Sequence, residues 1–499
     1  MDTIFQPKLI INADDFGWFQ QRDTGIIEGF ETGAISSTSA IANGNYLEES
    51  LNKIKDLNYG VGLHLNLTDG PPVYQNNIAS NSLVGKYMWY PNDYEDQIQI
   101  DGFHGLFPLH SLIKQDKIKE IDLENEIRAQ LARFIILRGK LPSHVDGHKH
   151  IQMIPLVANV LGKIMTREFG IYKVRFSFDE SEKLSKDMKF QYEESIKIYK
   201  SYGINSTDYF FGKFGDGKFS KESIIKNLDK YQTILKKSAN ISVEMMCHVG
   251  YPSVNPPKCF SSSQQRVKEL RILQDDSLQN YIKNNYKIVS YEEIENEINI
   301  KDKSLRKILQ INPKKQLILS YCNINAEEGC LEYLDNIVDL LKDINDVYFV
   351  QVRGEQFDQN YLLQYVNKLN QIKYENQHIR DKIIYVHTLE KDQIIKSLNE
   401  VDLFLSYSPS ENPTNFEILK QCLLRNVISI VRNTKLNQSI IQNEQNGFLI
   451  SNCNNIKSKC LNILQNKNSI SSIIKNNLKS LQINQHQRED MNEEQKLNN

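Results

Sequence analysis

The chain has 499 residues, of which 40% are hydrophobic and 24% are charged, and its formal net charge is −2. Because a single hydrophobic core rarely grows to this length, we expect two domains. The composition is typical of a globular protein, and the balanced charge gives no basis for a nucleic-acid or anionic-membrane partner.

Strands and helices alternate from residue 8 to about residue 295. KLIIN (8–12) and residues 60–67 have the pattern of strands, and residues 121–138 form the clearest helix. Residues 70–115 carry little periodicity and are expected to form a long loop over the mouth of the barrel, where a substrate would bind. The alternation favours a mainly parallel sheet or barrel. Further short strands are expected at 174–178, 241–247 and 287–291.

A second alternating block follows a charged, weakly periodic stretch. This pattern predicts an open, doubly wound α/β domain. Its strands are expected at 316–322, 347–352, 382–388, 401–407 and 427–433. The expected division is a first domain over 1–295, a linker over 296–314, a second domain over 315–468, and a polar, partly disordered tail over 469–499.

Three predicted strand ends carry carboxylates or imidazoles. INADDFG (11–17) supplies Asp14 and Asp15, GLHLNLT (62–68) supplies His64, and SHVDGHKH (143–150) supplies His148. An α/β barrel gathers its catalytic side chains at such ends. Asp and His hold a hydrolytic metal while leaving a coordination position open for water. Each run alone has an ordinary structural explanation, but together they predict a metal-dependent hydrolase.

Hydrolysis of an amide or ester requires several steps, which the metal and the candidate side chains can share. A divalent metal lowers the pKa of bound water towards ~7 and polarises the carbonyl group. Side chains of consecutive residues diverge in an extended backbone, so Asp14 and Asp15 need not share one role. His64 and His148 are the natural imidazole ligands. A histidine at a further strand end, His248 in EMMCHVG (244–250), suits the acid that protonates a departing amine.

Other polar residues of SHVDGHKH are candidates for an outer shell. His144 and Asp146 lie just upstream of His148, where they are predicted to orient it, and His150 is assigned to the same shell. Four aromatic residues are candidates for stacking against a substrate, with ordinary packing or lid contacts as the alternative. These aromatic residues are Trp18, Tyr87, Trp89 and Tyr90.

The first ~295 residues resemble the YdjC-like carbohydrate deacetylases, which include bacterial chitooligosaccharide deacetylases. The shared motifs occur in the family's order: NADDFG (12–17), STSAIANG (37–44), GLHLNLT, GKYMWY (85–90), SHVDGHKH and EMMCHVG. The resemblance implies a distorted (β/α) barrel, one divalent metal ion (magnesium or zinc), and removal of N-acetyl groups from amino-sugar oligosaccharides. Carried over by position, it implies metal ligands at Asp15, His64 and His148, a base at Asp14 and an acid at His248.

The chain departs from the family pattern at a few positions. Lys149 and Gln152 stand where the family often has histidines, and Val249 stands where it usually has proline. None of these changes removes an implied catalytic group, so we expect an active enzyme.

Residues 315–465 resemble the nucleotide-sugar-binding half of a GT-B glycosyltransferase, a Rossmann-like domain. Glu411 or Glu417 stands for the first glutamate of the donor motif, but Lys420 falls where the second belongs and Arg425 where a glycine belongs. The expected module is therefore degenerate. An active glycosyltransferase and a non-catalytic sugar-binding scaffold remain open as alternatives, as does a homodimer.

The cysteines and the N-terminus bear on the compartment. The seven cysteines are scattered and form no CxxC pair, which argues against a disulfide framework or a thiolate zinc site. The first residues, MDTIFQPKL, lack the order of a signal peptide, and no stretch is long and apolar enough to span a bilayer. We therefore expect a cytoplasmic protein.

Overall fold

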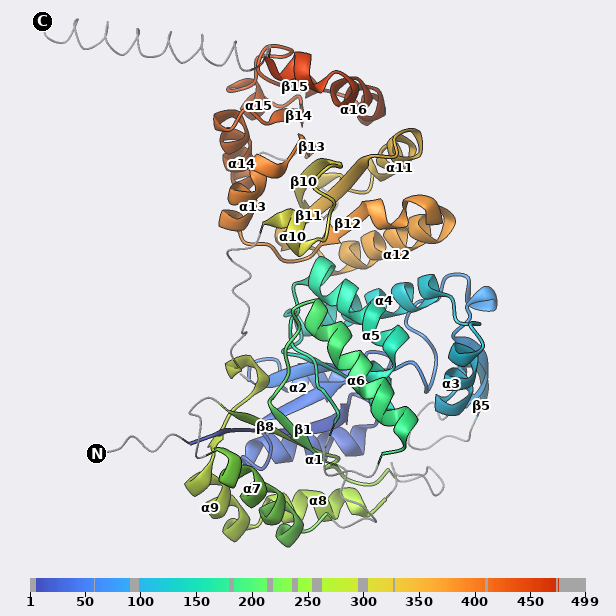
Figure 1. The fold of residues 1–499 in the computed structure, drawn as a ribbon, viewed down its shortest axis with the longest axis vertical. Coiled ribbons are helices and arrows are strands. Elements are labelled where there is room, and N and C mark those ends of the chain that lie inside the picture. Colours follow the sequence, from blue (N-terminus) through green and yellow to red (C-terminus); the bar gives the residue numbers. More distant parts are fainter. Residues whose placement is uncertain are drawn as a thin grey trace, which may run out of the picture. The chain divides into compact units, whose positions relative to one another are not determined.

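The computed structural model divides the chain into two compact units, which are described separately (Figure 1). Unit 1 comprises residues 1–166 and 171–298, and unit 2 comprises residues 167–170 and 299–499. The described residues are 6–57, 59–89, 98–178, 184–212, 219–235, 241–253, 263–294, 304–325, 328–408, 412–472 and 474. Among them, no helix combines the length and apolar character that crossing a bilayer requires.

A curled parallel sheet forms the centre of unit 1. Its strand order is β6-β3-β2-β1-β8-β7, and β9 pairs with the start of β1. Every pairing in this sheet is parallel, so the carboxyl ends of its strands share one edge. The strands are β1 (Lys8–Phe16), β2 (Ser37–Ala40), β3 (Gly60–Leu65), β6 (Val145–Gly147), β7 (Tyr209–Phe211), β8 (Ser242–Cys247) and β9 (Lys287–Ile288).

Helices connect these strands, as parallel pairing requires. The predicted helix at 121–138 is confirmed as α4 (Glu120–Arg138), and it ends at Gly139, whose φ of +73° is a conformation that favours glycine. The others are α1 (Gln20–Glu31), α2 (Leu47–Lys53), α3 (Leu106–Lys114), α5 (Pro155–Ile164), α6 (Lys186–Ser201), α7 (Lys221–Leu235), α8 (Gln265–Leu273) and α9 (Asp276–Asn285).

Two expectations for unit 1 are wrong in part. Residues 70–115 are not one loop, because they contain α3 and an antiparallel hairpin of β4 (Val84–Trp89) and β5 (Ile98–Phe103). The pairing of β4 with β5 depends on the register between the two strands, which the pattern of hydrophobic residues within one strand does not reveal. The strand expected at 174–178 is reduced to a bridge at Val174. The next residue, Arg175, is drawn into a buried network of charges.

Unit 2 contains the second parallel sheet, in the order β12-β11-β10-β13-β14-β15. Each of the five strands predicted in this block is confirmed. The first strand, β10, lies inside the sheet, and the chain winds outward from it to both edges, as expected for a doubly wound domain. The strands are β10 (Gln316–Ile324), β11 (Val347–Phe357), β12 (Ile383–Val386), β13 (Leu403–Ser406), β14 (Ile428–Arg432) and β15 (Phe448–Ile450).

The helices of unit 2 follow from local signals. Asn412 caps the start of α14 by accepting hydrogen bonds from the backbone N–H groups of Thr414 (2.9 Å) and Asn415 (3.2 Å), and Pro413 occupies its first position. The helices are α10 (Leu305–Ile308), α11 (Leu334–Asp343), α12 (Gln359–Glu375), α13 (Lys391–Ser397), α14 (Pro413–Leu424), α15 (Lys435–Gln438) and α16 (Ile456–Gln465).

Candidate active site

The end of β1 separates two consecutive carboxylates. Pairing of β1 with β2 shifts register between Ala13 and Phe16, which places Asp14 and Asp15 in an irregular segment. Asp15 has a φ of +74°, so the backbone turns sharply at this residue. A bulge of this kind re-aims the side chains that it contains. Both carboxylates are buried at the carboxyl edge of the sheet, and they contact different partners.

Asp15 lies against the two histidines predicted as metal ligands. Its Oδ1 atom is 3.4 Å from Nε2 of His64 and 3.1 Å from Nδ1 of His148. The ligand atoms of these three residues all lie within 4.8 Å of one another, which allows one cation to contact all three. The other oxygen of Asp15, Oδ2, is paired with Arg266 at 2.7 Å and Arg22 at 3.2 Å. These pairs leave Oδ1 facing the imidazoles.

Each histidine also contacts a carboxylate through its other ring nitrogen. Nδ1 of His64 lies 2.8 Å from Oδ1 of Asp146, and Nε2 of His148 lies 3.2 Å from Oδ2 of Asp69. A carboxylate at this position fixes the tautomer and the ring orientation of a metal-binding histidine. The other two ring nitrogens, Nε2 of His64 and Nδ1 of His148, are the ones that face Asp15.

The partner predicted for His148 is corrected here. Asp146 lies in β6, which pairs directly with β3, and this register places it opposite His64. His148 follows Gly147 at the start of a 3-10 turn, and its ring instead contacts Asp69 in the loop after β3. Sequence reasoning missed Asp69, although this acid directly follows the GLHLNLT motif.

The remaining two histidines of the motif have other neighbours. The His144 ring stacks on Tyr291, with centroids 3.7 Å apart, and its Nε2 is 3.9 Å from Oδ2 of Asp146. His150 lies edge-on to Phe210 at 6.2 Å. Neither belongs to a group of side chains that could hold a metal ion among the residues that the structure describes.

The charges around the three ligand atoms favour a cation. Burial lowers the pKa of His64, but the charge of Asp146 and the hydrogen bonds to Asp146 and Asp15 outweigh burial and raise the pKa to about 10. Burial also lowers the pKa of His148, and hydrogen bonds to Asp15 and Asp69 raise it above its ordinary value. Because the surroundings stabilise both imidazoles as cations, the site carries an excess of negative charge, and the donor set therefore fits a divalent metal.

Asp14 contacts a buried arginine that the sequence reasoning missed. Its Oδ2 and Oδ1 atoms lie 2.7 and 2.8 Å from Nη1 and Nη2 of Arg175. The same guanidinium contacts Oδ2 of Asp146 at 2.8 Å and Oε1 of Glu244 at 2.6 Å. An arginine inside the apolar segment VRFSF (174–178) was the available sequence signal, because a buried charge requires a partner.

His248 lies directly after β8, beside β1 in the sheet. Its backbone N–H group donates a hydrogen bond to Oε2 of Glu269 at 2.7 Å. Burial lowers the pKa of His248 to about 4, against the charges of Asp14 and Asp15, which raise it. The imidazole is therefore neutral at rest, and the pairing of Ala13 with Cys247 places the backbone of His248 beside that of Asp14.

The aromatic candidates are placed differently from one another. Trp18 is buried, and its ring is stacked near His148 with centroids 6.0 Å apart. The Tyr87 hydroxyl group, from β4, donates a hydrogen bond to Oδ1 of Asp69 at 2.7 Å. Trp89 is the last residue of β4, but its side chain and the whole of Tyr90 lie outside the described residues.

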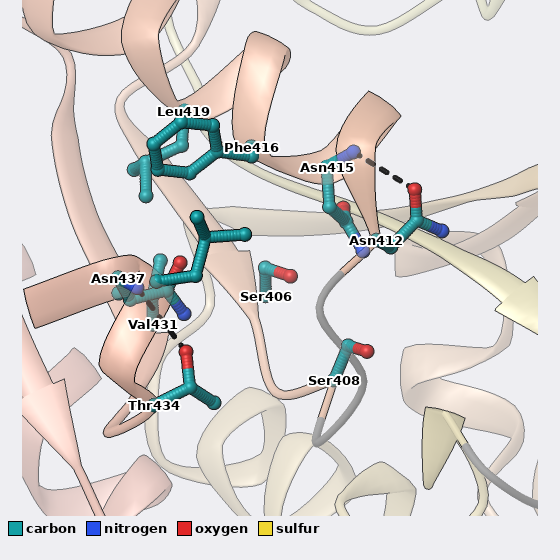
Figure 2. Close-up of a pocket in the computed structure, with 10 residues that line it drawn as sticks. Ser406, Ser408, Asn412, Asn415, Phe416, Leu419, Val431, Thr434 and Asn437 are labelled. Carbon is teal, nitrogen blue, oxygen red and sulfur yellow. Dashed lines mark hydrogen bonds between the residues drawn. The ribbon is translucent and has the colours of Figure 1, made fainter. Parts of the chain in front are cut away.

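A small pocket in unit 2 lies at the carboxyl ends of β13 and β14, beside the start of α14 (Figure 2). Its described lining is uncharged: Ser406, Ser408, Asn412, Asn415, Phe416, Leu419, Val431, Thr434, Leu436 and Asn437. Glu417 is paired instead with Lys420, at 2.6 Å on the surface of α14. Glu411 lies outside the described residues.

Comparisons with known proteins found similar proteins for the first part of the chain. The YdjC-like protein family matches residues 8–284. A carbohydrate deacetylase of Danio rerio is 29% identical over 313 residues, which is 55% of this chain and 95% of that protein. A chitooligosaccharide deacetylase of Proteus mirabilis (strain HI4320) is 26% identical over 289 residues, 57% of this chain and 98% of that protein.

A solved structure is also similar to part of this chain. The C-terminal domain of a glycosyl transferase group 1 family protein from Francisella tularensis is 16% identical, with a TM-score of 0.28, and the match covers 35% of this chain and 87% of that one. Family membership rests on the first block, since the family match spans more than half of the 499 residues. The chain belongs to the YdjC-like protein family.

Proposed function

We propose that this chain is a metal-dependent carbohydrate deacetylase that removes N-acetyl groups from amino-sugar oligosaccharides. One observation carries the proposal: Asp15, His64 and His148 converge on one point, with a further carboxylate behind each imidazole. Asp14 and His248 lie beside this point and supply the proton transfers that amide hydrolysis requires. The names and coverage of the deacetylases of Danio rerio and Proteus mirabilis support the same substrate class.

The metal would be held by Oδ1 of Asp15, Nε2 of His64 and Nδ1 of His148. When bound, such an ion polarises the amide carbonyl and makes water a stronger nucleophile at neutral pH. Asp and His ligands suit magnesium or zinc. The strand bridges beyond β6, at Val174 and Asn205, support a distorted (β/α) barrel as the scaffold of the site.

The protein's own groups move the protons. Water adds to the amide carbonyl as Asp14 accepts its proton, and the C–N bond then breaks as the amine nitrogen takes a proton from His248. The products are acetate and a free amino sugar. His248 is neutral at rest because burial holds its pKa at about 4, so it must gain a proton before it can donate one. The nearby Asp14 and Asp15 charges favour that uptake.

We further infer that unit 2 is a glycosyltransferase-like module without transferase activity. A donor pyrophosphate is usually held by basic side chains or by glycine backbone at a helix start. The described lining of the pocket at α14 contains neither lysine, arginine nor glycine. This composition supports the degenerate module over an active second enzyme.

The test combines metal analysis with acetate release. The purified full chain should contain a divalent metal and release acetate from N,N′-diacetylchitobiose or longer chitooligosaccharides. Each of three variants should release acetate about 1,000-fold more slowly, or slower still: Asp14→Ala, His64→Ala and His148→Ala. His110→Ala, on α3, is the matched histidine control and should behave like the wild-type chain. Unchanged turnover in the three site variants would contradict the proposal.

A further inference from the structure

One arginine holds three buried carboxylates of the site together. Arg175 is fully buried, and its Nε, Nη1 and Nη2 atoms all make ion pairs or hydrogen bonds of 2.6–2.8 Å. The partners come from distant parts of the chain: Asp14 near the end of β1, Asp146 in β6 and Glu244 in β8. Charge-assisted contacts of this length are the strong ones, so the four groups form one rigid unit.

Two of these carboxylates belong to a second set of residues that resembles a metal site. Ligand atoms of Asp14, His64 and Asp146 lie within 4.8 Å of one another, as those of Asp15, His64 and His148 do. Nη1 of Arg175 contacts Oδ2 of Asp14 at 2.7 Å and Oδ2 of Asp146 at 2.8 Å. The guanidinium therefore already provides a positive charge between the two carboxylates that a second metal ion would bridge.

The same contacts distinguish the two oxygens of Asp14. A carboxylate oxygen has two lone pairs. Oδ1 accepts hydrogen bonds from Nη2 of Arg175 at 2.8 Å and from Nδ2 of Asn12 at 2.9 Å, so both of its acceptor positions are used. Among the described residues, Oδ2 accepts only from Nη1 of Arg175. One acceptor position on Oδ2 thus remains for a further proton donor.

Arg175 is itself fixed from the opposite side. Oε1 of Glu244 accepts from its Nε atom at 2.6 Å, and the Tyr291 hydroxyl group donates to the other oxygen of Glu244. The guanidinium also lies over the Phe210 ring, 5.6 Å from its centroid. Glu244 belongs to the EMMCHVG segment that supplies His248, so the acid and the support of Arg175 are delivered by one strand.

We propose that Arg175 is a positioning residue that takes the place of a second metal ion. It holds Asp14 so that Oδ2 faces the reacting water, and it holds Asp146 so that His64 keeps its metal-binding orientation. The site then binds one divalent ion per chain. The catalytic part of this inference rests on the proposed deacetylase function, whereas the metal stoichiometry does not.

The test compares Arg175→Lys with Arg128→Lys in the full-length protein. Arg128 is an equally buried arginine that pairs with Glu124 within α4, so its substitution controls for the loss of a buried guanidinium. Metal-stripped protein is titrated calorimetrically with Mg²⁺ or Zn²⁺, and acetate release gives kcat and KM. Thermal unfolding shows whether both variants fold.

The wild-type chain should bind one ion. Arg175→Lys should leave KM unchanged and lower kcat about 100-fold, because Asp14 is misplaced. It should also lower the affinity for the metal ion about 10-fold, because Asp146 no longer orients His64. Glu244→Gln, which keeps the guanidinium and removes its fixed support, should lower kcat by a smaller factor. Arg128→Lys should change the melting temperature but neither kcat nor metal affinity.

Two results would overturn the inference: two ions bound per wild-type chain, or an Arg175→Lys variant whose kcat and metal affinity match those of Arg128→Lys. These results are separate from a failure of the proposed function. If the wild-type chain releases no acetate, the deacetylase assignment fails. The ion count and the metal affinity of Arg175→Lys still decide whether Arg175 replaces a second ion.

Discussion

The carboxyl edges of the two parallel sheets differ in charge. In unit 1 this edge gathers Asp14, Asp15, His64 and Asp146, all buried. In unit 2 the pocket at the corresponding edge is lined by serine, threonine and asparagine side chains, together with apolar ones. Both sheets provide the same kind of platform, so the chemistry depends on which side chains the strand ends deliver. A fold-level likeness to an enzyme therefore says little about unit 2.

Removal of the metal should have the largest effect, and it should affect unit 1 but not unit 2. Chelation should abolish acetate release, a loss of about 1,000-fold or more, and added Mg²⁺ or Zn²⁺ should restore it. Because an ion at 100 times its Kd stabilises the folded state by about 2.7 kcal/mol, unit 1 should also unfold at a lower temperature. Differential scanning calorimetry checks this, with unit 2 as internal reference. Equal shifts in both units would contradict the assignment of the metal to unit 1.

The next largest effects are expected from Asp69 and Asp146, the carboxylates that contact the two histidines. Asp69→Asn and Asp146→Asn each keep the shape of the side chain but remove the charge that orients an imidazole. We expect metal affinity to fall about 10- to 100-fold in each variant, measured by calorimetry. Asp101→Asn, an exposed acid paired with Lys86 on the hairpin, is the control and should bind metal normally. Wild-type affinity in the first two variants would show that these contacts do not tune the ligands.

Buried acids away from the ligands make unit 1 sensitive to pH. Burial raises the pKa of Asp23 from 3.8 to about 7, against hydrogen bonds from Ser50 and Gly17 that lower it. The folded state thus holds a proton that the unfolded state releases. The resulting stability is fully present below pH ~4 and is lost as the pH rises to ~7, a change of about 4 kcal/mol.

Asp23→Asn tests this dependence, because an amide can still accept from Gly17 and donate to Ser50. The variant should lose less stability than the wild-type chain between pH 4 and 7, as measured by denaturant unfolding followed in unit 1. Unit 2 should unfold with the same pH dependence in both proteins. If the free energy of unfolding of the variant changed with pH as steeply as that of the wild-type chain, Asp23 would be ionised in the folded state.

The smallest effects are expected from unit 2. UDP-glucose and GDP-mannose should give no binding heat in calorimetry with the full chain, because the described pocket at α14 offers no charged partner for a pyrophosphate. Asn412→Ala should weaken the start of α14 by about 1 kcal/mol and leave acetate release unchanged. Stoichiometric binding of either nucleotide sugar would instead favour an active transferase module.

The predictable parts of the molecule were those encoded locally. Helix α4 was recognisable from its spacing and from Gly139, and the strand ends bearing Asp14, His64 and His148 from their motifs. The contacts between these groups were not. Asp14 and Arg175 are 161 residues apart, and their bond depends on the sheet bringing both to one edge.

The hairpin shows the same limit. The segment at 84–103 lacks a clear period, yet β4 and β5 pair residue by residue, because cross-strand contacts stabilise what single-strand pattern does not indicate. Asp69 was overlooked for a related reason. It stands in a loop after β3, where an acid is usually solvated, and only the tertiary structure places it beside His148.

Asp69 has one consequence for how the enzyme would respond to its ligands. Its carboxylate accepts a hydrogen bond from Tyr87 of β4 and contacts the ring of His148, so a single side chain links the hairpin to the proposed metal site. Sharing of this kind is a thermodynamic linkage. If the site binds an ion as proposed, a ligand that displaces Tyr87 should change the affinity for that ion, and the ion should change the affinity for that ligand by the same factor.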